Sequence, residues 1–347
     1  MGNSSNNRIE FIDLAKGICI LLVVTLHIAP EIGSKFSFLT CLRMPLYYCL
    51  SGLFFKEYGG FSKFITKKTD KLLIPFIGWY LVSYLIYYVR VLAIGEPEHI
   101  FRLSDLFLEP EFYNGSLWFL LSLFWCNILY FLISKISGKL GVQALLVIGC
   151  GIIGWLWGYA DLHNFLYIGT TFTCLPFFFM GRQLFNSGIL SSENHLWKDI
   201  TILCVCAGVS IFYIFFAENP VYMRFYLNYL VSGDYISLYI LSIALVVMTL
   251  IICKFIGRIP YVSYLGRYSI IVLVTHGLLN NIFNRSIRHI FGMPLEDATF
   301  QLLLLVVIIA LMALIIPLCR KFLPYISAQK SLLEDKIMPK FVLKTGV

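Results

Sequence analysis

Ten stretches of about 20 mostly apolar residues follow one another along the chain, and they constrain its fold more than any other feature. A soluble fold would have to expose such stretches as large apolar patches. Hydrophobic residues make up 59% of the 347 residues and charged residues 13%, against about 45–50% and about 25% in an average soluble protein. The sequence therefore predicts an all-α fold: a polytopic helical bundle whose main partner is the lipid bilayer.

The positions of the Lys and Arg residues indicate how this bundle is oriented. The expected spans lie near residues 10–30, 37–56, 72–94, 115–134, 140–158, 164–185, 199–217, 234–253, 265–284 and 300–322. With the N-terminus inside, 20 of the 27 Lys and Arg fall in cytoplasmic segments, giving a net charge of +12 there and −4 outside. We expect both termini to be cytoplasmic. Because the charge follows the loops and forms no basic stripe with interleaved aromatics, no nucleic-acid partner is expected.

The polar stretches between the spans are too short to fold as soluble domains. We therefore expect one integral membrane domain over residues 1–347, with a bundle at about 10–322 and a cytoplasmic tail at 323–347. The basic start before an apolar run is also typical of a secretory signal. It lacks the small-residue cleavage pattern and His27 interrupts it, so the run is expected to persist as the first helix.

Three ionisable residues, Asp13, Lys16 and His27, lie in the otherwise apolar first span. Such groups are costly at membrane depth and indicate function. Lys16 and His27 are eleven positions apart, which places them about 20° apart on one helix face and roughly 16 Å apart along its axis. Asp13 falls on the same side and can pair with Lys16. The alternatives are that Asp13 and Lys16 reach the interface as a helix end and that His27 is a packing residue.

Several short motifs follow in order along the chain. They are Arg8-Ile-Glu-Phe-Ile-Asp13 with Lys16 and His27, Met44-Pro45 to Ser51-Gly52, a basic cluster before Leu73-Ile-Pro75, Ser116-Leu-Trp118, Leu175-Pro176 to Gly181, and Leu265-Gly266-Arg-Tyr-Ser269 followed by His276. In number and order they resemble the acyltransferase-3 family of integral membrane acyltransferases, over about residues 8–280. The chain departs from the family at Lys16 and at Lys68 and Lys71, where arginine is frequent, and lysine lacks the fork that grips phosphate bidentately.

The resemblance implies transfer of an acyl group, commonly acetyl, from cytoplasmic acyl-CoA to a hydroxyl of a carbohydrate. The acceptor it implies is a cell-envelope polysaccharide or a lipid-linked glycan precursor, and the chain looks closest to the short sugar O-acetyltransferase branch. It implies no permanently bound cofactor, and a place in the bacterial cytoplasmic (inner) membrane. No cysteine or histidine spacing suits a metal. The rival hypothesis is a transporter or flippase of an envelope glycolipid, for which buried charges are also suitable.

Within this resemblance His27 is the expected catalytic residue, either as general base toward the sugar hydroxyl or as a nucleophile that carries the acyl group. Lys16 would steer the donor. The cluster formed by Lys67, Lys68 and Lys71, with Lys63 before it, would attract the phosphates of CoA; the alternative is an ordinary positively charged inner loop.

Four further residues belong to the expected site. Arg43 would hold a developing oxyanion or the acceptor, and otherwise lies at the interface. His276 is a second acid or base, or a hydrogen-bonding residue inside the bundle. Ser51 and Trp118 are motif members expected to bind substrate, with an interfacial anchor as the alternative for Trp118. The acidic outer loop at 95–115 is either a carbohydrate-binding or a solvated segment.

Overall fold

The computed structural model describes residues 10–94, 113–190, 196–291 and 297–334. The acidic residues of the outer loop, which lie between positions 96 and 111, and the end of the expected tail, 335–347, fall outside the described residues.

Long helices form the body of the protein and occupy the segments that the apolar runs predict. They are α1 (Glu10–Ile28), α3 (Thr40–Leu53), α5 (Ile74–Ile94), α7 (Trp118–Ile136), α8 (Leu140–Tyr159), α9 (Ile168–Asn186), α10 (Leu196–Ile211), α11 (Tyr235–Ile256), α13 (Ser269–Phe291) and α14 (Ala298–Phe322). Each expected span contains one of them, so the predicted all-α polytopic bundle is confirmed.

The other elements are short. They are the helices α2 (Pro30–Lys35), α4 (Phe61–Lys68) and α12 (Pro260–Arg267), the 3-10 helices η1 (Ser37–Leu39), η3 (Gly115–Leu117), η4 (Phe165–Tyr167) and η6 (Phe225–Leu227), the π-helices η2 (Thr69–Leu73) and η5 (Phe212–Phe216), and the strands β1 (Tyr222–Arg224) and β2 (Tyr229–Ser232). The strands pair antiparallel, with Arg224 opposite Tyr229. We did not expect this hairpin, because an alternation of three or four residues is too short to stand out in a sequence.

Among the described residues, seven helical segments are long and apolar enough to cross a membrane, and eight if the pair α12 and α13 is one span broken by an 89° bend. Helices α3 and α9 do not meet this criterion. Helix α3 has 14 residues, about 21 Å of helix, against a hydrocarbon core of about 30 Å. Nearly all of α3 is buried inside the protein, so protein rather than lipid surrounds it. The expected number of ten spans and the cytoplasmic placement of the termini stay predictions.

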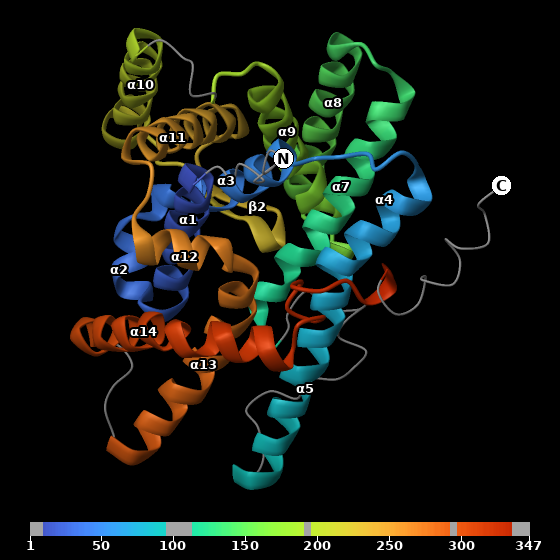
Figure 1. Ribbon diagram of the computed structural model, residues 1–347. Coiled ribbons are helices and arrows are strands. Elements are labelled where there is room, and N and C mark those ends of the chain that lie inside the picture. Colours follow the sequence, from blue (N-terminus) through green and yellow to red (C-terminus); the bar gives the residue numbers. More distant parts are fainter. Residues whose placement is uncertain (1–9, 95–112, 191–195, 292–296, 335–347) are drawn as a thin grey trace, which may run out of the picture.

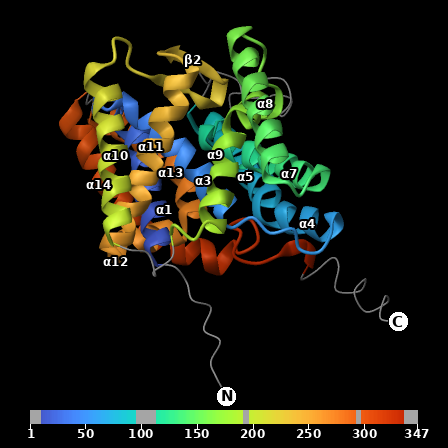
Figure 2. The ribbon, with the colours of Figure 1, turned by 90° about the horizontal axis from the view of Figure 1, so that it is seen from above.

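The arrangement of the helices separates a protein-facing centre from a lipid-facing rim. Helix α1 packs against α3, α11, α12 and α13 in the centre of the bundle (Figure 1). Helices α8 and α10 lie at its periphery (Figure 2) and point apolar side chains such as Leu145 and Val205 outward. Figure 2 also shows the hairpin at one end of the bundle and helices α4 and α12 at the other.

Glycines allow α1 and α12 to touch backbone to backbone. A Cβ added at Gly266 would lie 1.9 Å from the carbonyl oxygen of Asp13, and one at Gly17 would lie 2.0 Å from that of Val262. Only residues without a side chain fit this crossing. Gly17 and the motif glycine Gly266 therefore fix the position of α1, the helix that carries His27.

A second crossing of the same kind joins α3 and α9. A Cβ at Gly52 would lie 1.8 Å from the carbonyl oxygen of Phe178, and one at Gly181 would lie 1.9 Å from that of Cys49. The glycines of two further motifs thus have a packing role, and the crossing holds the helix that carries Arg43.

Ion pairs join helix ends and loops at the end of the bundle that holds α4 and α12. They are Arg258–Glu10, Arg267–Asp13, Lys67–Glu334, Lys135–Glu57 and Lys254–Asp199. Each basic member comes from the set that the loop count assigns to the cytoplasm. The hydrogen bond from Lys135 lowers the pKa of the Glu57 carboxyl.

Candidate active site

His27 lies in the last turn of α1, near the opposite end from the ion pairs. Its backbone carbonyl accepts a hydrogen bond from Asn280 Nδ2 of α13 at 3.1 Å. Its side chain is exposed, and it lines a cavity of about 260 Å³. The predicted catalytic imidazole is therefore held by its backbone while its ring stays open to a ligand.

His276 of α13 lies beside His27 and is fully buried. The two ring centroids are 5.1 Å apart in an edge-to-face arrangement, with 65° between the ring planes. His276 Nδ1 is 2.9 Å from the carbonyl oxygen of Val272, which only accepts, so Nδ1 carries the proton. The other ring nitrogen, Nε2, is then the acceptor, and Ser116 Oγ lies 3.4 Å from it. The structure thus brings together two histidines that the sequence separates by about 250 positions.

The turn before α7 is fixed by Asn114. Its buried side chain donates from Nδ2 to the carbonyl of Val274 at 2.8 Å and to Ser83 Oγ at 3.3 Å. This ties the turn to α13 next to His276, and it presents Ser116 and Trp118 to the cavity. Trp118 packs on Tyr167, with ring centroids 5.9 Å apart.

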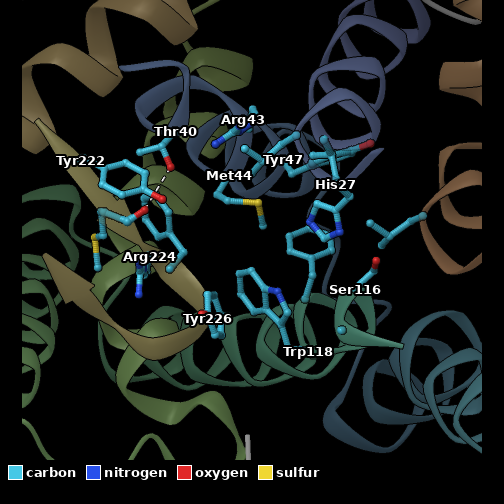
Figure 3. A pocket seen from close by; sticks show the side chains of 17 residues that line it. His27, Thr40, Arg43, Met44, Tyr47, Ser116, Trp118, Tyr222, Arg224 and Tyr226 are labelled. Carbon is cyan, nitrogen blue, oxygen red and sulfur yellow. Dashed lines mark hydrogen bonds between the residues drawn. The ribbon is translucent and has the colours of Figure 1, made fainter. Parts of the chain in front are cut away.

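The cavity wall is mostly aromatic and apolar, with a small number of polar groups (Figure 3). It is formed by Val23, Leu26, His27, Thr40, Arg43, Met44, Tyr47, Gly115, Ser116, Trp118, Phe119, Tyr222, Met223, Arg224, Phe225, Tyr226 and Leu273. This composition is typical of a small-molecule site.

Arg43 reaches this cavity from α3 and is buried, with 5% of its surface exposed. One turn earlier, Thr40 Oγ1 donates to the carbonyl of Met223 at 3.0 Å, the bond drawn dashed in Figure 3. This bond seats strand β1 on the start of α3. Tyr222 and Arg224, which flank Met223, line the cavity on that side.

A buried polar network fixes the hairpin to α9. Asn164 Nδ2 donates to the carbonyl of Tyr226 at 2.9 Å, and Thr170 Oγ1 donates to that of Phe225 at 2.5 Å. On the far side of the turn, Thr173 Oγ1 donates to Asn228 Oδ1 at 2.7 Å. Side-chain hydrogen bonds on both sides of its turn therefore anchor the part of the cavity wall that the hairpin forms.

Other expected site residues lie away from the cavity. Asp13 is buried, and its Oδ2 is 3.6 Å from Arg267 Nε. Lys16 is half-buried, and its Nζ lies 4.9 Å from the ring centroid of Phe54. Ser51 is half-buried beside Gly52, at the α3–α9 crossing. None of these lines the cavity around His27.

Two of the three lysines expected to bind the donor contact the segment that follows α14. Lys67 Nζ is 2.5 Å from Glu334 Oε2, and Lys71 Nζ donates to the carbonyl of Ala328 at 2.7 Å. Lys68 Nζ lies 5.7 Å from the ring centroid of Phe64. The buried carboxylate of Asp70 anchors the segment by accepting backbone N–H groups of residues 332–334 at 2.9, 2.9 and 3.4 Å.

Several cavity residues were not expected from the sequence. Thr40, Ser116, Tyr222, Arg224 and Tyr226 line the site without having been assigned a role. The sequence feature that could have indicated them is the run Tyr-Met-Arg-Phe-Tyr at 222–226, which places three aromatic residues and an arginine in an expected outer loop. Within the described part of the chain, no group of three or more His, Cys, Asp or Glu is placed to hold a metal ion.

Chemically, the cavity combines an accessible imidazole, a hydroxyl hydrogen-bonded to a second imidazole, two guanidinium groups and aromatic walls. An imidazole can accept a proton near neutral pH, and a guanidinium can stabilise a negative charge that develops nearby. Aromatic faces suit the apolar side of a ring-shaped ligand. These groups suit the attack of a hydroxyl on a carbonyl carbon.

Comparison with known proteins gives one match. Residues 9–319 match the family model Acyl_transf_3, described as an acyltransferase domain. No curated protein and no solved structure matches the chain. The matched region includes every cavity residue.

Proposed function

This chain belongs to the acyltransferase-3 family and is a membrane acyltransferase, and we propose that it moves an acyl group, acetyl in particular, from acyl-CoA to a hydroxyl of a cell-envelope carbohydrate. The observation that carries this proposal is the open imidazole of His27 in a cavity that Ser116 and Arg43 also line, with His276 buried directly beside His27. The acceptor is a polysaccharide or a lipid-linked glycan, and the membrane is the bacterial cytoplasmic membrane. Within the family, the branch that this proposal assigns to the chain is that of the short sugar O-acetyltransferases.

In the first mechanism that suits this geometry, His27 is a general base. A ring nitrogen takes the proton of the acceptor hydroxyl, the oxygen attacks the thioester carbon, and the carbon–sulfur bond breaks as the ester forms. The proton then passes from the imidazolium to the CoA thiolate. Arg43 stabilises the oxyanion of the tetrahedral intermediate.

In the second mechanism, His27 is a nucleophile. Its ring nitrogen attacks the thioester carbon, CoA leaves as the thiol, and the acyl-imidazole then passes the group to the acceptor hydroxyl. The two mechanisms differ in one measurable respect: an acyl carrier releases one equivalent of CoA thiol without acceptor, whereas a general base releases thiol only when acceptor is present.

The donor would enter from the opposite end of the bundle. Lys67, Lys68 and Lys71 lie there on α4 and η2, and they would attract the CoA phosphates as point charges. Lys16 lies on α1 eleven residues before His27, nearer the start of that helix, and its positive charge would steer the donor arm. The segment around Glu334 contacts two of the three lysines, so the donor would compete with it.

A transporter or flippase is the rival proposal. Beside the His27 imidazole, His276 is held in one tautomer and has Ser116 as a hydroxyl partner. Acyl transfer can use each of these groups, whereas a transporter does not need them. The family match also favours chemistry.

The test uses the purified full chain in liposomes with radiolabelled acetyl-CoA and envelope glycan fractions. Thiol release and label transfer to the glycan are expected, and both should require His27. Glycan movement without label transfer would contradict the enzyme and support the flippase.

A further inference from the structure

Arg43 is a buried cation that has no countercharge in the described part of the chain. Its guanidinium makes no hydrogen bond or ion pair with any residue that the structure describes, although only 5% of Arg43 is exposed. Arginine stays protonated in proteins, so the charge cannot be removed by a pKa shift. Burying an unpaired charge is costly, and a side chain kept in this state is explained by a ligand that supplies the opposite charge.

Arg224 brings a second cation to the same cavity. The bond from Thr40 to the carbonyl of Met223 docks β1 on the first turn of α3, and Thr40 and Arg43 are neighbours three positions apart on that helix. Because Met223 precedes Arg224, the docking places the two arginines on one side of the cavity, as Figure 3 shows. Like charges repel, so an anion between them would stabilise both.

Among the described residues, the rest of the wall supplies no negative charge. Its 17 residues include the two arginines and neither an aspartate nor a glutamate. A neutral sugar would leave this imbalance in place. An oxyanion of the reaction would neutralise Arg43 only during the chemical step, and it leaves Arg224 unexplained.

The backbone elements that carry the two arginines are fixed before a ligand arrives. The hairpin is fixed by Asn164, Thr170 and Asn228, and α3 by its glycine crossing with α9. Two forked cations on anchored elements bind a carboxylate or phosphate with less loss of entropy than two cations on flexible segments.

We propose that the acceptor bound in this cavity carries a negative charge close to its sugar ring, a carboxylate or a phosphate, which Arg43 and Arg224 hold while the aromatic wall contacts the ring. The proposal rests on the proposed function, because it assigns the cavity to the acceptor. It names the acceptor class as acidic carbohydrates, among which a sugar acid supplies a carboxylate and a lipid-linked precursor supplies a phosphate.

Binding to the purified full chain, measured by calorimetry without acyl-CoA, tests the inference. The probes are methyl glucoside, methyl glucuronoside, glucose 1-phosphate and inorganic phosphate. At least one acidic sugar is expected to bind about tenfold or more tightly than the neutral one, the size of effect that a charge-assisted hydrogen bond gives. Which acidic sugar binds better distinguishes a carboxylate from a phosphate acceptor.

The variants Arg224→Gln and Arg43→Gln are expected to remove this preference, and Arg43→Lys keeps the charge in case the buried position does not tolerate Gln. Arg90→Gln, in α5 and outside the cavity lining, is the matched control and should keep it. The inference is overturned if acidic and neutral sugars bind alike, if no acidic sugar binds, if inorganic phosphate alone binds as tightly as glucose 1-phosphate, or if both arginine variants keep the preference.

The result is separable from the proposed function. An acidic preference without any acyl transfer would uphold the anionic site and refute the enzyme reaction. Acyl transfer to glycans without a preference for acidic sugars would uphold the enzyme reaction and refute the anionic site.

Discussion

The imidazole rings of His27 and His276 meet edge to face with centroids 5.1 Å apart, although they belong to the first helix and to one of the last. The buried ring has its proton held on Nδ1 by a backbone carbonyl, while the other ring is open to the cavity. The open ring of His27 is therefore the one placed to react, and the buried ring of His276 supports it. His27 is the one that a substrate can reach.

Replacing His27 by alanine is expected to lower label transfer by about 100-fold or more, because general acid–base catalysis contributes at least this much. The measurement is transfer of radiolabelled acetyl groups to glycan, with thermal unfolding as the check on folding. His163→Ala, in an exposed loop at the same end of the bundle, serves as the control and should transfer at the wild-type rate. Wild-type transfer by a folded His27→Ala variant would refute the proposed chemistry.

Ser116→Ala should act through His276 and not through folding. The substitution removes the hydroxyl that faces Nε2, a hydrogen bond worth about 1 kcal/mol, so the transfer rate is expected to fall about fivefold with little change in KM for the donor. Ser210→Ala removes a buried hydroxyl that bonds only to its own helix, and it should leave the rate unchanged. Equal rates in the two variants would show that Ser116 does not support the site.

Much of the fold was predictable because lipid imposes simple requirements on a chain. Within the described ranges, apolar runs located ten long helices, including α3, which is too short to count as a span. The hairpin was not predictable, because its alternation is short and its stability comes from distant partners such as Asn164 and Thr170.

The candidate site was predictable only where one helix carries the signal. The first span marked His27, but the neighbourhood of His276, Ser116 and Arg224 depends on how α13, the turn before α7 and β1 come together. The motif glycines Gly52 and Gly266 had no expected role of their own, and the structure gives them a packing role at helix crossings.

Glu334→Gln is expected to improve donor binding. Glu334 forms an ion pair with Lys67 in the structure, and a pair at this exposure stabilises by up to about 1 kcal/mol. Removing the carboxylate frees Lys67 for the donor, so KM for acyl-CoA should fall by up to about fivefold. Initial rates at low and high salt measure this, since salt should weaken the effect. Glu57→Gln, which frees Lys135 at the same end, is the control and should not alter KM.

The same prediction requires Lys67 itself. Lys67→Gln should raise KM for acyl-CoA. Adding Glu334→Gln to this variant should then leave KM unchanged, because the lysine that Glu334 pairs with is gone. An unchanged KM in Lys67→Gln would remove this lysine from the donor site.

Gly266→Ala is expected to destabilise the protein and to disturb the site from a distance. The added methyl group would lie 1.9 Å from the backbone oxygen of Asp13, which no side-chain rotation can relieve. Overpacking of this kind costs about 1–3 kcal/mol or more. Thermal unfolding of the detergent-purified protein measures it. Because α12 holds α1, acyl transfer should also fall as His27 shifts.

The control is Gly149→Ala in α8, where nothing lies within 4 Å of the new methyl group. This variant should gain up to about 1 kcal/mol of stability from the higher helix propensity of alanine, and it should keep its activity. A Gly266→Ala variant as stable as Gly149→Ala would mean that the α1–α12 contact does not position His27.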